Sequence, residues 1–245
     1  MCGRFSLTAN NDELNQRFGT SVLQNLVPRW NIAPAQSSLI LRPRGLELVA
    51  EMAEFGRPSG PQNKRLINAR SETVHEKPTF KDRFESARCL VVASGWFEWS
   101  APRKPWHIQL LDGRVMAMAG LYFADTKGKA AQFVILTTPA DGSLHDLHHR
   151  CPLVLPATNW SNWLSGSMAQ AANCLVPASA SYFNAYRVSP DVGNIKNDNA
   201  SLVAPYNEDA EKKISSGQPD LFGWFILPIY FWPVYFWPVY FCLEQ

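Results

Sequence analysis

Residues 88–99 read RCLVVASGWFEW, which is two β-strand patterns in direct succession. The first half is an apolar run with adjacent valines, and the second half is dominated by aromatic side chains. Both residue types favour strands. No segment long enough for a helix separates the two halves. Strands that follow one another without intervening helices indicate an antiparallel sheet rather than alternating βαβ units.

The same pattern recurs outward in both directions. Runs of β-branched, aromatic or other apolar residues occupy 38–42, 46–50, 106–111, 115–123 and 132–138. Gly and Pro residues punctuate these runs at positions 45, 113 and 139, as is typical of turns. We therefore predict an α+β fold with a mixed, mainly antiparallel sheet.

Two segments predict flanking helices. Residues 12–27 follow a plausible N-cap at Asn11 or Asp12, and Pro28 ends the segment. Residues 156–165 form the second segment, because their apolar side chains recur at helical spacing. The apolar face of this second helix comprises Trp160, Trp163 and Leu164.

The composition is that of a globular chain. Of the 245 residues, 46% are hydrophobic and 18% are charged, which excludes an extended disordered protein. The formal charge of +2 neither requires nor excludes nucleic acid, so DNA binding has to rest on local patches. Residues 1–205 contain no linker and are expected to form one domain, followed by a polar tail over 206–220.

Residues 221–245 differ from the rest of the chain. Between 221 and 243 there is no charged residue, and YFWPV occurs twice in tandem from residue 230. The length matches a membrane span, but the recurring prolines would leave backbone groups unsatisfied in lipid. A membrane anchor, an exposed adhesive tail and a non-native extension are the alternatives. We favour the non-native extension and assign the segment no function.

The five cysteines are an odd number, without a CxxC pair and without a secretory signal. We therefore expect free thiols in a reducing cytoplasm. Cys89, Cys151 and Cys174 lie in or beside apolar runs and are interpreted as small core residues. Cys2 is different because it is the second residue of the chain.

Removal of Met1 would leave Cys2 with a free α-amine beside its thiol. The amine titrates near pH 7.7–8.0 and the thiol near 8.5, so both nucleophiles are partly available at about neutral pH. An aldehyde forms an imine with such an amine, and the thiol then closes a five-membered thiazolidine ring. An interior cysteine cannot do this, because its nitrogen belongs to a peptide bond.

Two strand-like segments carry polar residues that could assist Cys2. In LINARSET (66–73), Asn68 and Arg70 alternate onto one face if the segment is extended. The amide suits a substrate oxygen and the guanidinium suits a phosphate. Glu98 lies between two aromatic residues, so burial should raise its pKa and make it a proton shuttle. The alternatives are a salt bridge for Arg70 and a solvent-facing Glu98.

Three of the five histidines lie in SLHDLHHRCPLVL (143–155). Zinc is one interpretation, but HExxH and CxxC are missing, and the adjacent His148 and His149 would point to opposite faces of a strand. We expect no metal. One histidine near the aldehyde is a candidate proton donor or acceptor, whereas His145 and His149 suit a surface.

Other residues could contact a DNA strand, although an ordinary role in packing or as surface charge is the default interpretation for each. A phosphate track could comprise Arg4, Arg29, Arg70, Lys81 and Arg83. The tryptophans at 30, 96, 99 and 106 are expected to be mostly core residues, of which one or two could stack on bases.

Six motifs occur in order: MCGRF (1–5), WNIAPAQ (30–36), INARSET (67–73), GWFEW (95–99), LHHRCPLVL (147–155) and VGNIKN (192–197). Together they resemble the SRAP family of abasic-site processing proteins, over residues 1 to about 205. The resemblance implies an α+β domain around a twisted, barrel-like sheet with flanking helices and a basic groove. It implies single-stranded DNA with abasic sites as the partner, and no metal or nucleotide cofactor. We expect a monomer.

The resemblance also implies residue roles. Cys2 matches the residue that crosslinks to the ring-opened sugar, and Asn68 matches an asparagine that positions this sugar. Glu98 matches a glutamate that deprotonates the Cys2 amine, and His148 matches a histidine that assists ring opening and imine chemistry. The implied DNA contacts are Arg4, Arg70, Asn31, Pro34, Phe55 and Lys81.

The chain departs from the family pattern between WNIAP and INAR. The stretch reads AEFGRPSGPQNKRL (53–66), and Phe55 stands where the family has a tryptophan. Phenylalanine stacks with less area than tryptophan, so we expect weaker base stacking there. The Cys2 chemistry is not affected by this change.

The resulting hypothesis is a cytoplasmic, nucleoid- or replication-associated protein that shields abasic sites through a Cys2 thiazolidine crosslink. An imine that is not trapped would lead to strand cleavage by β-elimination, a lyase activity. A cysteine or N-terminal-nucleophile peptidase is the first alternative, with His148 as base and Asn68 or Glu98 as its orienting partner. The family is also described as a peptidase because it removes its own Met1. The second alternative is a non-covalent module that binds single strands.

Overall fold

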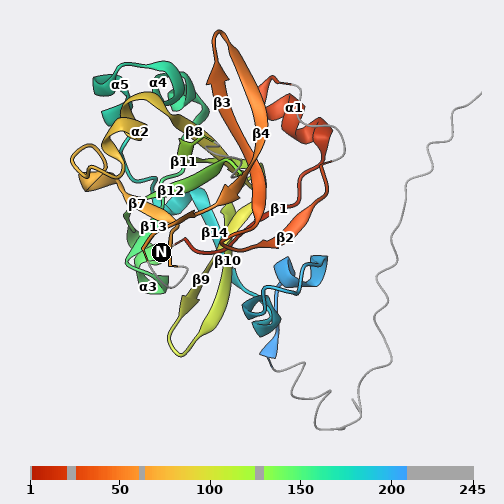
Figure 1. Ribbon diagram of the computed structural model, residues 1–245. Helices are drawn as coiled ribbons and strands as arrows, with labels where there is room; N and C mark the ends of the chain where they lie inside the picture. The colour runs from red at the N-terminus through yellow and green to blue at the C-terminus, as the bar shows by residue number, and fades with distance from the viewer. Residues whose placement is uncertain (1, 21–25, 61–63, 125–129, 209–245) are drawn as a thin grey trace, which may run out of the picture. The chain divides into compact units, whose positions relative to one another are not determined.

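The computed structural model describes residues 2–20, 26–60, 64–124 and 130–208 (Figure 1). By its internal contacts the chain divides into one unit of Met1–Asn207 and a second of Glu208–Gln245. The aromatic repeat of 221–243, and the predicted polar tail beyond residue 208, lie outside the described residues.

Five strands of the first unit form a closed circuit. They are β3 (Ser37–Arg44), β4 (Glu47–Phe55), β8 (Arg88–Ala93), β11 (Met116–Phe123) and β12 (Gln132–Pro139). The order is β11-β8-β3-β4-β12, and β12 also pairs with β11, which closes the circuit. Only the β12–β4 pairing in this ring is parallel. Closure protects the sheet edges, and the predicted mixed, mainly antiparallel, barrel-like α+β fold is confirmed.

Two short strands extend the barrel beyond this circuit. β7 (Asn68–Arg70) pairs with β12 in parallel, and β13 (Arg150–Pro152) pairs with it in the antiparallel sense. The register places Asn68 beside Ile135 and Cys151 beside Thr138. Strands from the INARSET and HHRCP motifs therefore both pair with β12, at the same end of the barrel.

A second, fully antiparallel sheet anchors the start of the chain. Its order is β14 (Phe183–Arg187), β10 (Lys104–Leu110), β9 (Gly95–Ser100), β1 (Phe5–Leu7) and β2 (Arg29–Ile32). Phe5 pairs with Trp96, so β1 lies along the GWFEW strand. A separate two-stranded sheet pairs β5 (Arg57–Pro58) with β6 (Arg65–Leu66).

Short helices lie around these sheets (Figure 1). The α-helices are α1 (Asn11–Phe18), α2 (Lys81–Ser86), α3 (Gly142–Leu147), α4 (Trp160–Ser165) and α5 (Met168–Ala172). The 3-10 helices are η1 (Ser71–Thr73), η2 (Ala157–Asn159), η3 (Ala180–Tyr182), η4 (Pro190–Gly193) and η5 (Ala200–Val203).

The helix predicted over 12–27 is wrong in its extent. Asn10, not Asn11 or Asp12, is the N-cap, and it forms a capping box with Glu13. The helix ends at Phe18 and is capped by Gly19, whose φ of 64° is the left-handed conformation that stops a helix. Residues 21–25 lie outside the described ranges, and 26–28 are not helical.

The helix predicted over 156–165 begins as η2 and becomes α-helical at Trp160. Its apolar face is confirmed. Trp163 is fully buried against the Phe84 ring, with 5.9 Å between the centroids, and Trp160 and Leu164 pack on the core.

The barrel interior is a continuous apolar core. Cys89, Cys151 and Cys174 are buried free thiols, as predicted. In the part of the chain that the structure describes, no helix is both long and apolar enough to span a membrane.

Candidate active site around Cys2

Cys2 lies three residues before the start of β1, in the same core as the barrel strands, and its side chain is fully buried. The Asn68 side-chain Nδ2 donates a hydrogen bond to the Cys2 backbone oxygen at 3.1 Å. The Phe97 N–H donates to the Arg4 carbonyl at 2.9 Å, so the pairing of β1 with β9 continues toward the chain start. This pairing brings the first residues level with Glu98.

The Cys2 thiol is held in its protonated form. Burial raises its pKa far above the ordinary range, and the nearby Glu98 carboxylate raises it further. The positive charge of the chain's terminal amino group and a hydrogen bond from the Arg4 backbone act in the opposite direction. A base is therefore required before this sulfur can act as a nucleophile.

Glu98 lies on β9 and is 5% exposed. Burial raises its pKa from the ordinary value of 4.5 to about 7, although the terminal amino group lowers it. The predicted burial and raised pKa of this carboxyl group are confirmed. A carboxyl group that titrates near neutrality accepts and releases protons equally well at physiological pH.

Asn68 supplies a fixed amide beside Cys2. Its Nδ2 lies 3.1 Å from the Cys2 oxygen and 3.4 Å from the Ile135 oxygen, so both amide hydrogens have acceptors. Its Oδ1 is buried and has no hydrogen-bond partner within the described ranges. A buried amide oxygen without a partner is costly unless a ligand donates to it.

His148 follows α3 and is partly buried. Its Nδ1 lies 3.0 Å from the Arg150 N–H, which can only donate. When Nδ1 accepts this bond, the neutral ring carries its proton on Nε2. Burial and the terminal amino group lower the pKa of His148, which favours the neutral ring. The His149 ring stacks on His148 with 4.3 Å between centroids, and His149 and His145 are exposed.

An ion pair that the sequence did not reveal braces these segments. Arg150 is 7% exposed, and it binds Glu72 through both terminal nitrogens and donates to the Thr137 carbonyl. The hydrogen bonds from Arg150 lower the pKa of Glu72 to about 2. The pair joins η1, which follows Arg70, to β13, which follows His148. Both residues lie in motifs already noted, but only spatial proximity identifies them as partners.

Arg4 and Asn31 belong to a network that holds the VGNIKN segment. Arg4 Nη1 donates to Asn31 Oδ1 and to the Val192 oxygen, each at 2.7 Å. Asn31 is fully buried, and its Nδ2 lies within 3.2 Å of the carbonyls of Val192, Asn194 and Asn197. A direct DNA contact by Asn31 is therefore not retained, because its side chain is saturated inside the protein. Arg4 remains half-buried over the Trp99 ring.

Asp198 was also missed by sequence reasoning. Its carboxylate accepts from the backbone N–H of Trp30 at 2.6 Å and of Asn31 at 3.2 Å, and it pairs with Arg29. It fastens the segment after VGNIKN to β2. Arg29, a candidate for the phosphate track, is consequently engaged inside the protein.

Phe55 does not occupy the position expected from the family pattern. Its ring is fully buried, 5.4 Å from the Phe5 centroid and stacked 5.3 Å from the Phe133 centroid. It faces the core, so a base cannot stack on it, and we correct the expectation that Phe55 contacts DNA.

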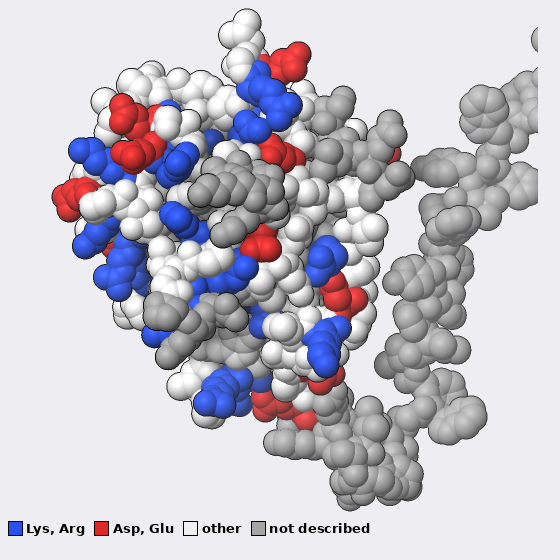
Figure 2. Space-filling view, viewed as in Figure 1, with Lys and Arg blue, Asp and Glu red and all other residues white. Residues whose placement is uncertain are grey.

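The remaining predicted contacts are accessible. Arg70 and Lys81 are exposed, and neither makes an ion pair or a side-chain hydrogen bond within the described residues. Pro34 is partly exposed at a turn in which the Gln36 N–H donates to the Ala33 oxygen. Basic side chains, with acidic ones among them, gather on the side of the molecule where α2 and β7 lie (Figure 2). Over the described ranges, no group of three or more His, Cys, Asp or Glu residues is placed to hold a metal ion.

Comparison with known proteins gives consistent matches. A family model described as SOS response associated peptidase (SRAP) matches residues 1–195. Abasic site processing protein YedK of Escherichia coli K12 is 32% identical over 84% of this chain and 100% of its own length. Abasic site processing protein YoqW of Bacillus subtilis 168 is 29% identical over 83% and 99%. A crystal structure of a protein from Bacteroides thetaiotaomicron shares the fold, with a TM-score of 0.71 and 23% identity, over 84% of this chain and 100% of that one.

Proposed function

This chain belongs to the SRAP family, and from that premise we propose that it captures abasic sites in single-stranded DNA through a covalent bond to Cys2. The observation that supports the proposal is that Cys2, Asn68 and Glu98 lie close together at the start of the chain. Cys2 is fastened by Asn68 and lies within the electrostatic reach of Glu98, a carboxyl group with a pKa of about 7. The names of the relatives supply the substrate class, which is DNA that contains an abasic site.

The amine of Cys2 is the first nucleophile in this proposal. Removal of Met1 frees an α-amino group with an ordinary pKa of about 7.7–8.0. Glu98, with its pKa of about 7, is matched to accept the ammonium proton. The opened sugar presents its aldehyde to the amine, while the buried oxygen of Asn68 accepts a hydrogen bond from a sugar hydroxyl.

The chemical balance requires two steps. The amine adds to the aldehyde carbon, and loss of one water gives the imine. The thiol then adds to the imine carbon, its proton passes to the nitrogen through Glu98 or His148, and a thiazolidine ring results. The net change is formation of one C–N and one C–S bond with loss of one water. An imine that is not trapped is open to β-elimination and strand cleavage.

The DNA strand is held mainly through its phosphates. Arg70 and Lys81 are exposed and unpaired within the described residues, and guanidinium and ammonium groups at such positions suit phosphate oxygens. Arg4 contributes from a half-buried position two residues after Cys2 in the chain. We therefore expect binding that weakens steeply with salt.

The test is intact-protein mass spectrometry, with denaturing electrophoresis, after incubation with abasic single-stranded DNA. The wild-type protein should lack Met1 and gain the mass of the DNA minus one water. Cys2→Ala should lose the stable crosslink but still form an imine that borohydride traps. Cys174→Ala, which also removes a buried thiol, should crosslink normally. A Cys2→Ala protein that crosslinks to the wild-type yield without reduction refutes the mechanism.

The peptidase alternative requires an activated thiolate. The pKa of the Cys2 thiol is raised rather than lowered, which does not support it. Cleavage of a peptide supplied in trans, lost in Cys2→Ala, would establish it nonetheless. Binding that ignores the abasic site would instead favour a non-covalent single-strand module.

A further inference from the structure

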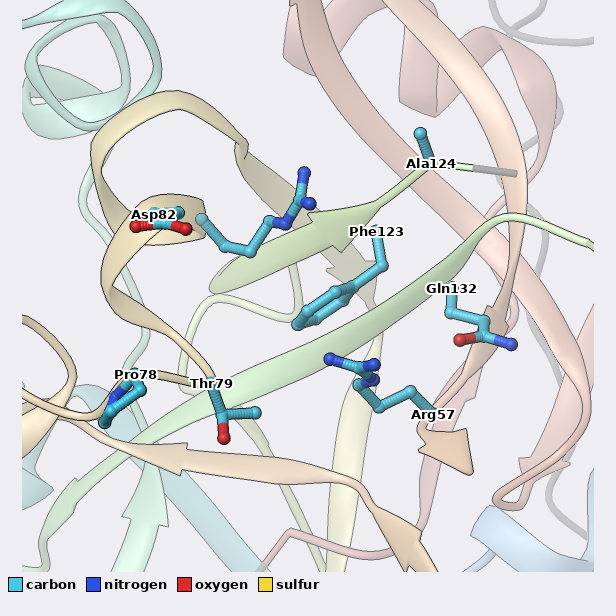
Figure 3. Close-up of a pocket in the computed structure, with 8 residues that line it drawn as sticks. Arg57, Pro78, Thr79, Asp82, Phe123, Ala124 and Gln132 are labelled. Carbon is cyan, nitrogen blue, oxygen red and sulfur yellow. The ribbon is translucent and has the colours of Figure 1, made fainter. Parts of the chain in front are cut away.

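A pocket of about 320 Å³ lies between α2, β5 and the adjoining ends of β11 and β12. Its lining includes Arg57, Arg83, Phe123, Thr79, Gln132 and Asp82. Figure 3 shows the Arg57 side chain beside the Phe123 ring, with Thr79 on one side of the pocket and Gln132 on the other. None of the residues that line this pocket takes part in the chemistry proposed at Cys2.

Two arginines in the pocket lie over the same aromatic ring. The guanidinium carbons of Arg57 and Arg83 lie 4.6 and 5.6 Å from the centroid of the same Phe123 ring. Neither forms an ion pair in the described parts of the chain, whereas Arg42, Arg65 and Arg150 each bind a carboxylate. Stacking on an aromatic ring fixes the plane of a guanidinium while its N–H edge stays available to an acceptor.

The chemistry of the pocket suits a phosphate group. Two guanidinium groups provide charge and paired donors, and the Thr79 hydroxyl and the Gln132 amide add neutral donors. Asp82 is the one carboxylate in the lining, and it is exposed on α2. Its charge opposes an anion, so the pocket should bind phosphate more tightly without it.

The pocket also has a defined position relative to Cys2. Gln132 precedes Ile135 by three residues on β12, and Ile135 pairs with Asn68, so the separation along the strand is about 10 Å. Arg57 pairs with Leu66, two residues before Asn68. Arg70 pairs with Thr137, on the other side of Ile135. The pocket and Arg70 therefore lie on opposite sides of Asn68 along β12.

We propose that the Arg57–Phe123–Arg83 pocket binds backbone phosphate of the same DNA strand, on the opposite side of the lesion from Arg70. This inference rests on the proposed function and extends it from the lesion to the flanking strand. Stacked nucleotides advance about 3.4 Å each, so the pocket is reached within about three nucleotides of the abasic sugar. The site would fix which flank, 5′ or 3′, contributes to binding.

The test separates binding from crosslinking. Fluorescence anisotropy is measured with single strands that carry a tetrahydrofuran abasic analogue, which has no aldehyde. One series extends only 5′ of the lesion and the other only 3′. Arg57→Gln/Arg83→Gln should weaken one series about tenfold and leave the other nearly unchanged. For the affected series, the slope of log binding constant against log salt concentration should be smaller in the double variant than in the wild type by about 1.4, if both arginines contact phosphate.

A matched control removes the same charge elsewhere. Arg44→Gln/Arg103→Gln alters the tips of the β3–β4 and β9–β10 hairpins and should leave both series unchanged. Asp82→Asn should tighten the same series that the double variant weakens, by about threefold. If the double variant fails to fold, Asp82→Asn alone tests the proposal. Tighter binding of neither series, or of both series, overturns it.

The possible results have the following consequences. Equal loss on both series, or no loss, overturns the proposal. Stabilisation of the wild-type protein by inorganic phosphate alone, lost in the double variant while both DNA series bind normally, identifies a free-anion site and also overturns it. A flank-specific loss supports the subsite even if abasic DNA is never crosslinked, in which case only the proposed function fails.

Discussion

Replacement of Glu98 by Gln should stabilise the protein, and more so as the pH rises. The folded-state pKa of Glu98 is about 7, against an ordinary value of 4.5, because burial disfavours the carboxylate. Below about pH 4.5 the group is protonated in both the folded and the unfolded state, so it costs nothing. As the pH rises from about 4.5 to about 7, the unfolded chain ionises Glu98 while the folded protein keeps it protonated, so stability is lost over this range and stays constant above it.

The magnitude follows from the two pKa values. A tenfold change in a proton-binding constant is worth about 1.4 kcal/mol, so the difference between 4.5 and about 7 corresponds to about 3 kcal/mol. Gln has nearly the shape of the protonated acid and carries no charge at any pH. We therefore expect the free energy of unfolding of Glu98→Gln, relative to wild type, to increase by about 3 kcal/mol between about pH 4.5 and 8.5.

Urea denaturation at both pH values measures this difference. Glu85→Gln, at an exposed position on α2, is the control and should show little change. Glu72→Gln should destabilise the protein at both pH values, because Arg150 lowers the pKa of Glu72 to about 2 and the paired carboxylate is ionised in this range. The destabilisation caused by this substitution should become smaller as the pH falls from about 4.5 toward 2. If Glu98→Gln differs from wild type equally at both pH values, Glu98 ionises without penalty and cannot serve as the proposed base.

Three further predictions concern other groups. Asn68→Ala should slow crosslinking about tenfold at saturating DNA, since one hydrogen bond of about 1.4 kcal/mol to the Cys2 carbonyl is lost; a gel time course measures the rate. Arg150→Met should lower the free energy of unfolding by about 2 kcal/mol, because the Thr137 carbonyl loses its charged donor; urea titration would contradict this if the midpoint did not move. His107 is buried, and its pKa is lowered from 6.5 to about 4, so its neutral ring contributes stability that is complete above pH 6.5 and lost as the pH falls toward 4. The destabilisation caused by His107→Gln should consequently shrink by about 3 kcal/mol between about pH 7 and 4, and a constant difference would exclude a buried neutral ring.

Local patterns were sufficient to predict the strands but not how they pair. The runs at 88–94 and 132–138 appear as β8 and β12, since residue type and punctuation determine such segments directly. The closure of β12 onto β11, and the parallel entry of β7, depend on contacts between residues far apart in sequence. The helix predicted over 12–27 was too long, because the left-handed conformation of Gly19 ends the helix although the apolar pattern continues beyond it.

For the candidate site too, local environments were predictable from the sequence, whereas contacts between distant residues were not. The environment of Glu98 followed from its aromatic neighbours, because a carboxyl group in such a strand is desolvated. The Arg150–Glu72 pair did not follow, since each residue alone resembles an ordinary surface charge. Phe55 was assigned by its place in a family pattern, yet its burial is decided by Phe5 and Phe133, which approach from other strands.

The hydrogen bond from Asn68 reaches the carbonyl of Cys2, not its sulfur or nitrogen, and this has a mechanistic consequence. Loss of Met1 changes only the nitrogen of Cys2, so the same bond can hold the residue before and after the amine is freed. Proton transfer from the new ammonium to Glu98 converts two opposite charges into two neutral groups, so the net charge of the buried site stays constant. The ordinary pKa of an α-amine is about 8 and that of Glu98 is about 7, so the two groups are closely matched for this transfer. In the proposed mechanism, the raised pKa of Glu98 is therefore what would make the free amine available inside an otherwise apolar core.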